Sequence, residues 1–92
     1  MKNAILKKVI VYSTKWCSDC LNAKMFLSVH KIPYDEVDIE RDEDAAQKVL
    51  EWSGGRRVIP TFEIHFAASN GKRKILHNPP LAVLAQEMGI IA

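Results

Sequence analysis

Long apolar runs and a strong excess of one charge are both missing from this 92-residue sequence. No apolar stretch approaches the roughly 18 residues that a membrane span needs, so we expect no membrane segment. The formal net charge of +2 is too small to indicate nucleic-acid binding. The apolar stretch near the start is interrupted by Lys7 and Lys8, and no small-residue cleavage site follows it, which argues against a signal peptide. These absences favour a cytoplasmic location.

Cysteine is scarce as well, because the chain has only Cys17 and Cys20. Secreted mini-domains usually carry four or more cysteines at scattered spacings. A disulfide between positions i and i+3 closes almost no loop, so it would restrict the unfolded chain very little. A stabilising staple is therefore disfavoured, and metal binding and redox chemistry remain as alternatives.

The hydrophobic periodicity predicts the element order β-α-β-α-β-β-α. The expected strands span residues 7–13, 34–39, 60–67 and 72–77, and the expected helices span residues 20–30, 40–55 and 81–89. One βαβ crossover and one hairpin, with its turn at Asn70-Gly71, give a four-stranded mixed sheet flanked by helices. The sequence shows no linker or repeat, so we expect a single α/β domain over residues 1–92.

Two side-chain patterns make predictions that coordinates can test. In the third strand, Phe62 and Ile64 alternate with Glu63 and His65, which predicts a half-buried strand whose polar side faces water. In the first helix, Ser18 or Asp19 is the expected N-cap. The buried stripe of this helix is expected to comprise Ala23, Phe26 and Leu27, with Leu21 and Met25 beside it.

The chemistry of the two cysteines follows from where they fall. Cys17 lies between a strand and its helix, at the carboxyl end of the strand, where open α/β sheets place ligand sites. Backbone N–H groups at the helix N-terminus, with Lys15 as a nearby cation, would favour a Cys17 thiolate, whereas the Asp19 carboxylate would disfavour it. Cys20, one turn further on, should be less exposed. We therefore expect Cys17 to attack a disulfide and Cys20 to resolve the mixed disulfide.

Metal binding is the alternative use of such a pair. A structural zinc site needs four ligands, and the CxxC motif supplies two. His30, His65 and His77 could complete a site, but a helix end and a polar strand side are ordinary places for solvated histidines. We expect no metal site.

Four segments of the sequence, "VIVYSTKWCSDC", "IPYDEVDIE", "SGGRRVIPTFEI" and "LHNPP", together resemble the glutaredoxins, which have the thioredoxin-like fold, and most of all the mycoredoxins. The resemblance covers residues 8–90. It implies that Cys17 is the nucleophile and Cys20 the resolving cysteine. It further implies that Pro60 is cis and that the Ile59 backbone pairs with a substrate. Lys15 and Trp16 match the substrate-binding rim before the nucleophile; for Trp16, simple packing is the alternative.

The resemblance also implies a function: a thiol-disulfide oxidoreductase that reduces protein disulfides, or mixed disulfides with a low-molecular-weight thiol. The co-substrate would be glutathione, mycothiol or bacillithiol, with no bound cofactor. Glutathione is the least favoured, since "LHNPP" replaces the Gly-Gly-acidic turn of glutathione-binding members. The protein is expected to be a monomer, recharged by the thiol and its reductase or by a flavoprotein reductase.

Two other functions remain open. Within the same class, the protein could be a dedicated electron donor to an enzyme such as ribonucleotide reductase. In another class, it could be a metal or iron–sulfur binding module that uses the CxxC motif. Trp16 and the element order argue against a copper-chaperone domain. The chain also lacks the single active cysteine followed by Gly-Phe-Ser that cluster-bridging glutaredoxins usually have.

Overall fold

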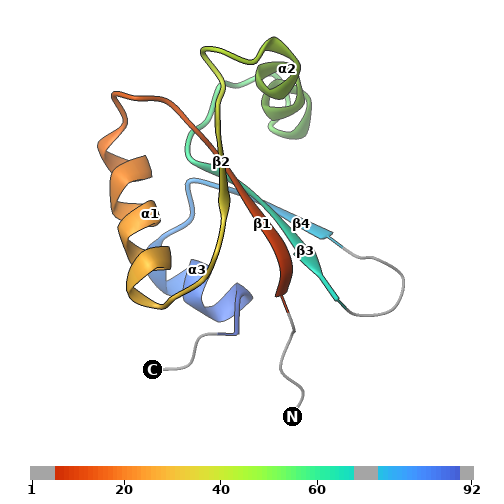
Figure 1. Ribbon diagram of the computed structural model, residues 1–92. Coiled ribbons are helices and arrows are strands. Elements are labelled where there is room, and N and C mark those ends of the chain that lie inside the picture. Colours follow the sequence, from red (N-terminus) through yellow and green to blue (C-terminus); the bar gives the residue numbers. More distant parts are fainter. Residues whose placement is uncertain (1–5, 68–72, 90–92) are drawn as a thin grey trace.

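A computed structural model describes residues 6–67 and 73–89, and it confirms the predicted fold class and element order (Figure 1). The elements are β1 (Leu6–Ser13), α1 (Ser18–Val29), β2 (Asp35–Asp38), α2 (Glu43–Trp52), β3 (Thr61–Phe66), β4 (Arg73–His77) and α3 (Leu81–Glu87). The strands form one mixed sheet, and the predicted Asn70-Gly71 turn lies outside the described residues. Within the described ranges, no helix has both the length and the apolar character to cross a membrane.

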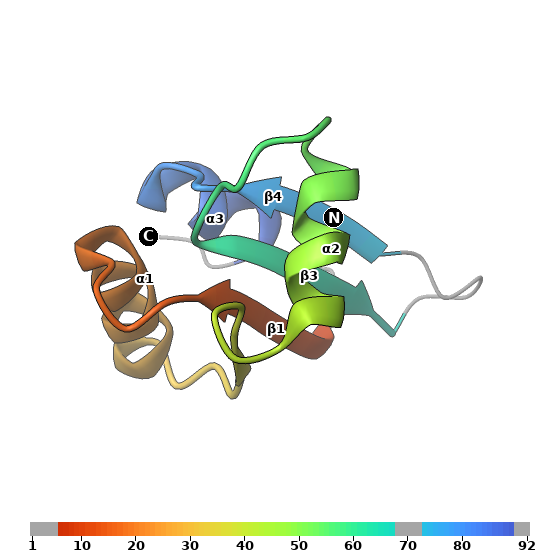
Figure 2. The same cartoon turned by 90° about the horizontal axis from the view of Figure 1, so that it is seen from above.

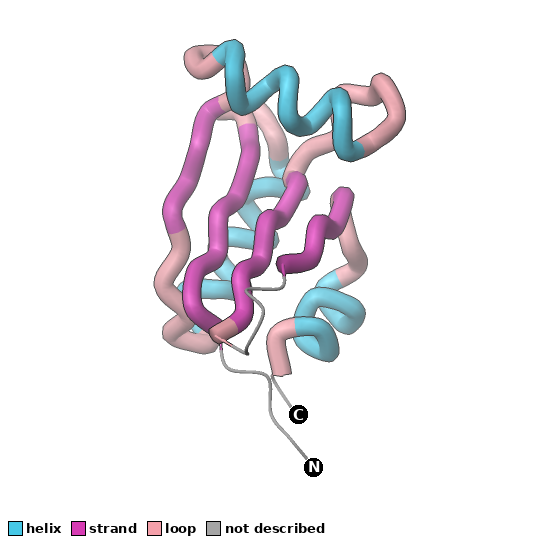
Figure 3. Tube along the Cα trace, turned by 90° about the vertical axis from the view of Figure 1, so that its right-hand side faces the viewer, coloured by secondary structure: helices cyan, strands magenta, loops and turns pink. Residues whose placement is uncertain are grey.

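The sheet has the strand order β2-β1-β3-β4, with β1 and β2 parallel and the other two pairs antiparallel. Figure 3 shows the strands side by side. Tyr12 near the end of β1 pairs with Thr61 at the start of β3, and Thr61 pairs in turn with His77 at the end of β4. The turn after β1, the segment before β3 and the segment after β4 therefore meet at one end of the sheet.

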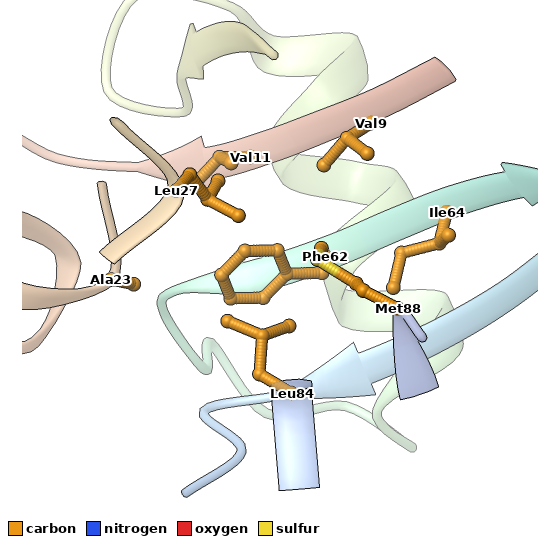
Figure 4. Packing of buried hydrophobic residues seen from close by; sticks show 8 residues of the cluster. All are labelled: Val9, Val11, Ala23, Leu27, Phe62, Ile64, Leu84 and Met88. Atoms are coloured by element: carbon orange, nitrogen blue, oxygen red, sulfur yellow. The ribbon is translucent and has the colours of Figure 1, made fainter. Parts of the chain in front are cut away.

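Helices cover both faces of the sheet (Figure 2). On one face, α1 and α3 pack over β1 and β3, and Phe62 lies between Leu27 of α1 and Leu84 of α3 (Figure 4). On the other face, α2 packs through Ala45 and Val49. The buried residues of the first face are Val9, Val11, Ala23, Leu27, Phe62, Ile64, Leu84 and Met88.

The helix ends differ from the predicted ones by a few residues, and local hydrogen bonds explain why. Asp42 caps α2 by accepting a hydrogen bond from Ala45 N at 3.0 Å, so this helix begins at Glu43 rather than at residue 40. It ends at Trp52, and Gly54 follows with φ +76°, a backbone conformation that favours glycine. The end of α1 has a similar turn, in which Lys31 takes φ +57° before Pro33 is reached.

Glu63 departs most from the sequence prediction. Phe62 and Ile64 share the buried face as expected, but on the opposite side of β3 Glu63 is only 5% exposed. Its carboxylate accepts a hydrogen bond from Tyr12 Oη at 2.6 Å and lies 2.8 Å from His65 Nε2. Arg73 donates at 3.3 Å, and its guanidinium also lies over the Trp52 ring. The prediction of a solvated polar side was therefore wrong for Glu63, because these neighbours cover it, whereas the His65 side chain remains 30% exposed.

This cluster makes stability depend on pH. Burial alone would raise the pKa of Glu63, but the hydrogen bonds from Tyr12 and His65, together with the charges of His65 and Arg73, hold it below its ordinary value of 4.5. The stabilising effect is therefore complete above about pH 4.5 and is lost as the pH falls through the lower, folded-state pKa. Urea denaturation at pH 7 and at pH 3 should show a smaller acid-induced loss of stability in Glu63→Gln than in the wild type.

Glu51→Gln provides the control for this measurement, since Glu51 is exposed on α2 and forms no ion pair with any of the described residues, so this variant should lose as much stability in acid as the wild type. An equal acid-induced loss of stability in the wild type and in Glu63→Gln would show that the Glu63 cluster does not stabilise the fold.

Candidate active site

Cys17 lies in the turn between β1 and α1, and it is itself the N-cap of the helix. Its backbone is extended, and its Sγ accepts a hydrogen bond from Cys20 N at 3.0 Å. Its carbonyl accepts the first helical bond, from Leu21 N at 3.1 Å. Neither Ser18 nor Asp19 is the cap, so that prediction was wrong. The sulfur takes the place of the usual cap oxygen. The Cys20 N–H, which has no partner within the helix, consequently points at this sulfur.

Cys20 lies one turn further into α1 and is fully buried, whereas Cys17 is partly exposed. The two sulfurs form a disulfide, with the Cα atoms 5.1 Å apart. The expectation that Cys20 is the less exposed cysteine is confirmed. An external reactant can therefore reach Cys17, while Cys20 can reach only Cys17.

The segments before β3 and after β4 adjoin this turn. The Ile59–Pro60 peptide bond is cis, as the family resemblance implies, and the Pro60 side chain is buried. Ile59 is half-buried, and its backbone makes no hydrogen bond to another of the described residues outside the regular elements. The backbone N–H and C=O of Ile59 therefore remain able to pair with an extended segment of another molecule.

Asn78 connects three parts of the site, and the sequence analysis did not single it out. Its backbone N donates to Pro60 O at 2.7 Å, and its side-chain Nδ2 lies 3.5 Å from Asp19 Oδ2, a long hydrogen bond. Its φ of +41° is one that asparagine tolerates better than most residues. The Asn-Pro pair after a strand is a turn signal that could have pointed to it.

Thr61 holds the start of β3 against the end of β4. Its hydroxyl donates to Val58 O at 2.7 Å and lies 2.8 Å from His77 Nδ1. Because the one hydroxyl proton goes to Val58, the His77 Nδ1–H is the donor of the second bond. His77 is thus occupied with Thr61.

Glu36 of β2 supports the turn before Cys17 from the other side. Its carboxylate accepts hydrogen bonds from Lys24 Nζ at 2.6 Å and from the buried Ser13 Oγ at 2.8 Å. The Lys24 bond, with the Ser13 bond second, lowers the pKa of Glu36. No local sequence pattern indicates this contact, because Lys24 and Glu36 are 12 residues apart, with the end of α1 and the following loop between them.

The structure bears differently on Trp16 and Lys15, the two residues predicted to form the substrate-binding rim. Trp16 is 86% exposed, so it does not take part in core packing. Lys15 is exposed and forms no ion pair with any residue in the described ranges, and its role as a cation near Cys17 stays a prediction.

The expected absence of a metal site stays a prediction. Across residues 6–67 and 73–89, no three His, Cys, Asp or Glu side chains group together in a way that could hold an ion. His65 lies against Glu63 beside α2, and His77 lies against Thr61.

The charge of Asp19 should affect the nucleophile. Asp19 lies in the first turn of α1, between the two cysteines. Replacing it with asparagine removes a negative charge near the sulfur, and we expect the pKa of the reduced Cys17 thiol to fall. The ultraviolet absorbance of the thiolate, followed against pH, measures this. Asn78→Ala is the control, because it removes the hydrogen bond to Asp19 but keeps the charge. An unchanged Cys17 pKa in Asp19→Asn would exclude the effect.

Comparison with known proteins agrees with this geometry. The glutaredoxin family model matches residues 9–65. A Mycobacterium tuberculosis protein named as a candidate glutaredoxin is 44% identical over 59 residues, which are 64% of this chain and 70% of the relative. The glutaredoxin-like protein NrdH of Lactococcus lactis is 35% identical over 65 residues (71% of this chain, 88% of the relative). Mycoredoxin 1 of Corynebacterium glutamicum is 32% identical over 56 residues (61% and 68%).

A solved structure of a mutant thioredoxin-like protein superposes with a TM-score of 0.68 at 26% identity, covering 92% of this chain and 99% of that one. The region that the family model matches, residues 9–65, contains the CxxC pair, Pro60, all of β2 and most of β1 and β3. The chain therefore belongs to the glutaredoxin family of thiol-disulfide oxidoreductases and has a thioredoxin-like fold.

Proposed function

We propose that this protein is a dithiol oxidoreductase that reduces protein disulfides, or mixed disulfides with a low-molecular-weight thiol, and that it works in the cytoplasm. One observation carries the proposal: a partly exposed Cys17 caps α1 and accepts the Cys20 N–H, while its disulfide partner Cys20 is fully buried. In the reduced protein the same N–H can donate to a Cys17 thiolate and lower the pKa of the thiol.

The reaction then has a fixed order. The Cys17 thiolate attacks the substrate disulfide, a mixed disulfide forms, and one substrate thiolate leaves. Cys20 next attacks Cys17 Sγ, which releases the second substrate thiolate and forms the Cys17–Cys20 disulfide seen in the structure. Two electrons pass to the substrate, and the two protons of the dithiol end on its thiols.

The substrate-binding residues are assigned by their surroundings. The backbone of Ile59, held beside the site by cis-Pro60, pairs with the extended chain next to the substrate disulfide. Trp16 supplies apolar contact at the rim, and Lys15 supplies positive charge there.

The low-molecular-weight thiol is proposed to be mycothiol rather than glutathione. A mycoredoxin is among the relatives. In addition, Asn78, tied to Pro60 and Asp19, occupies the place after β4 where the family resemblance would require a Gly-Gly-acidic turn for glutathione.

A second candidate is supported by the NrdH relative, 88% of whose length the match covers. In that function the protein is a dedicated electron donor, for example to ribonucleotide reductase, and a flavoprotein reductase reduces its disulfide again. The chemistry at Cys17 and Cys20 is the same, and only the source and destination of the electrons differ.

One experiment tests the class and separates the candidates. The oxidised protein is offered mycothiol, bacillithiol, glutathione or a flavoprotein reductase with its nicotinamide, and turnover of a mixed-disulfide substrate is followed. Recharging by mycothiol well above the other thiols supports the first candidate, and recharging by the flavoprotein alone supports the second. No turnover with any of the four would overturn the proposed function.

A further inference from the structure

One side of α1 is apolar although it faces solvent. Leu21, Met25 and Val29 are each more than half exposed, and they are among the six large hydrophobic side chains that are exposed in the described part of the chain. The face that α1 buries against the sheet is a different one, formed by Cys20, Ala23 and Leu27. We call Leu21, Met25 and Val29 the α1 ridge.

The α1 ridge is in line with the nucleophile. Leu21, Met25 and Val29 follow Cys17 at intervals of four residues, so each lies about one turn and about 6 Å further along the helix. The ridge winds slowly around α1, because a step of four residues turns by about 40° beyond a full circle. Cys17 lies at one end of the ridge, and the exposed Trp16 precedes it there. An apolar surface thus begins at the reactive sulfur and extends away from it.

The surface beside the ridge is concave and nearly neutral. An open groove of about 400 Å³ runs along the same side of α1 and is lined by Leu21, Met25, Val29 and Tyr34, with Lys24 and Ser28 completing it. Among the described residues that line the groove, Lys24 is the only cation, and its ammonium is paired with Glu36 at 2.6 Å. This groove does not select a charged segment, so its occupant contributes apolar side chains.

The size of the surface indicates what kind of partner covers it. With Trp16, the α1 ridge exposes on the order of 500 Å² of apolar area, the size of the largest and often functional patches on monomeric proteins. A stable dimer usually buries about 800 Å² or more on each partner, whereas redox encounters use smaller interfaces. A transient protein partner therefore fits the ridge better than a second copy of this chain.

We propose that the α1 ridge is the docking surface for the protein whose disulfide this chain reduces. The partner lays the apolar side of an amphipathic helix along Leu21, Met25 and Val29, and in doing so brings its disulfide to Cys17. This inference rests on the proposed function, and it adds the partner's contact surface. A small mixed disulfide does not reach the ridge and does not depend on it.

The test uses two synthetic peptides of identical composition. Each carries a terminal cysteine as a mixed disulfide with thionitrobenzoate, whose release is followed by absorbance. One peptide is helical with apolar residues every four positions, and the other has the same residues scrambled. We expect the wild type to reduce the helical peptide about tenfold faster than the scrambled one, the effect of an apolar anchor contact. Met25→Glu should remove that advantage.

The controls separate docking from chemistry. Met25→Glu should reduce hydroxyethyl disulfide, which is too small to reach the ridge, at the wild-type rate. Val83→Glu, which adds the same charge at an exposed apolar position of α3, should keep the preference for the helical peptide. Equal rates for the two peptides with the wild type would overturn the inference, and so would equal slowing of hydroxyethyl disulfide in Met25→Glu.

Two further outcomes are also decisive. A wild-type dimer in sedimentation that Met25→Glu dissociates would assign the ridge to a second copy and overturn the inference. A wild type that reduces neither peptide nor hydroxyethyl disulfide would overturn the proposed function itself, and the docking inference with it.

Discussion

Cys17→Ser is expected to abolish turnover of both protein disulfides and small mixed disulfides, by about three orders of magnitude or more. A serine hydroxyl ionises far above neutral pH, so the helix N–H that points at position 17 has no thiolate to stabilise. Cys20 cannot take over, because it is fully buried beneath Cys17. The measurement is the rate of reduction of both substrate types under identical recharging conditions.

Cys20→Ser is the matched control for that variant. It keeps the attacking thiol but removes the resolving one, so a protein substrate should remain attached to Cys17 as a mixed disulfide that mass spectrometry detects. Reduction of a small mixed disulfide can continue with external thiol. Substantial activity of Cys17→Ser would contradict the assigned order of attack, since it would require α1 to open and expose Cys20.

Phe62→Ala is expected to lower the free energy of unfolding by about 3–5 kcal/mol. Phe62 is fully buried between Leu27 and Leu84, so it joins the two helices that cover one face of the sheet (Figure 4). The whole stability of a domain is only about 5–15 kcal/mol, so this loss should leave part of the protein unfolded near physiological temperature. Denaturant titration measures the change.

A substitution at the surface calibrates that experiment. Val83→Ala removes apolar atoms from an exposed position of α3 and should change the free energy of unfolding by no more than about 0.5 kcal/mol. A loss below about 1 kcal/mol for Phe62→Ala would show that its neighbours close the space that the ring leaves. In that case the contact between α1 and α3 would not depend on Phe62.

The order of the elements and the placing of the cysteines were predictable, because both follow from local signals. Alternation with Glu63 and His65 placed Phe62 and Ile64 on one face of β3, and the hydrophobic periodicity predicted the first strand at residues 7–13. The CxxC pair after that strand predicted a reactive sulfur at a helix start. The family resemblance, rather than any local pattern, predicted the cis bond at Pro60.

What the sequence did not predict depends on contacts between distant segments. Alternation shows which residues of β3 share a side, but it does not show that Tyr12 and Arg73 cover the side of Glu63. Helical spacing places Met25 near the stripe of Ala23 and Leu27, yet Met25 and Leu21 are exposed because α1 turns them away from the sheet. Cys17 was missed as a cap because sulfur is an unusual cap atom.

The strand order has a consequence for how this protein behaves at high concentration. β2 is at one border of the sheet, where none of the described strands lies beside the backbone groups of its outer side. It is only four residues long, and three of the four are acidic: Asp35, Glu36 and Asp38. Charged side chains fill this short border, with Asp35 ion-paired to Lys8 and Glu36 to Lys24 of the same molecule, so a second strand would have to pack against them. The short acidic strand therefore protects the fold against growth into intermolecular β-ribbons.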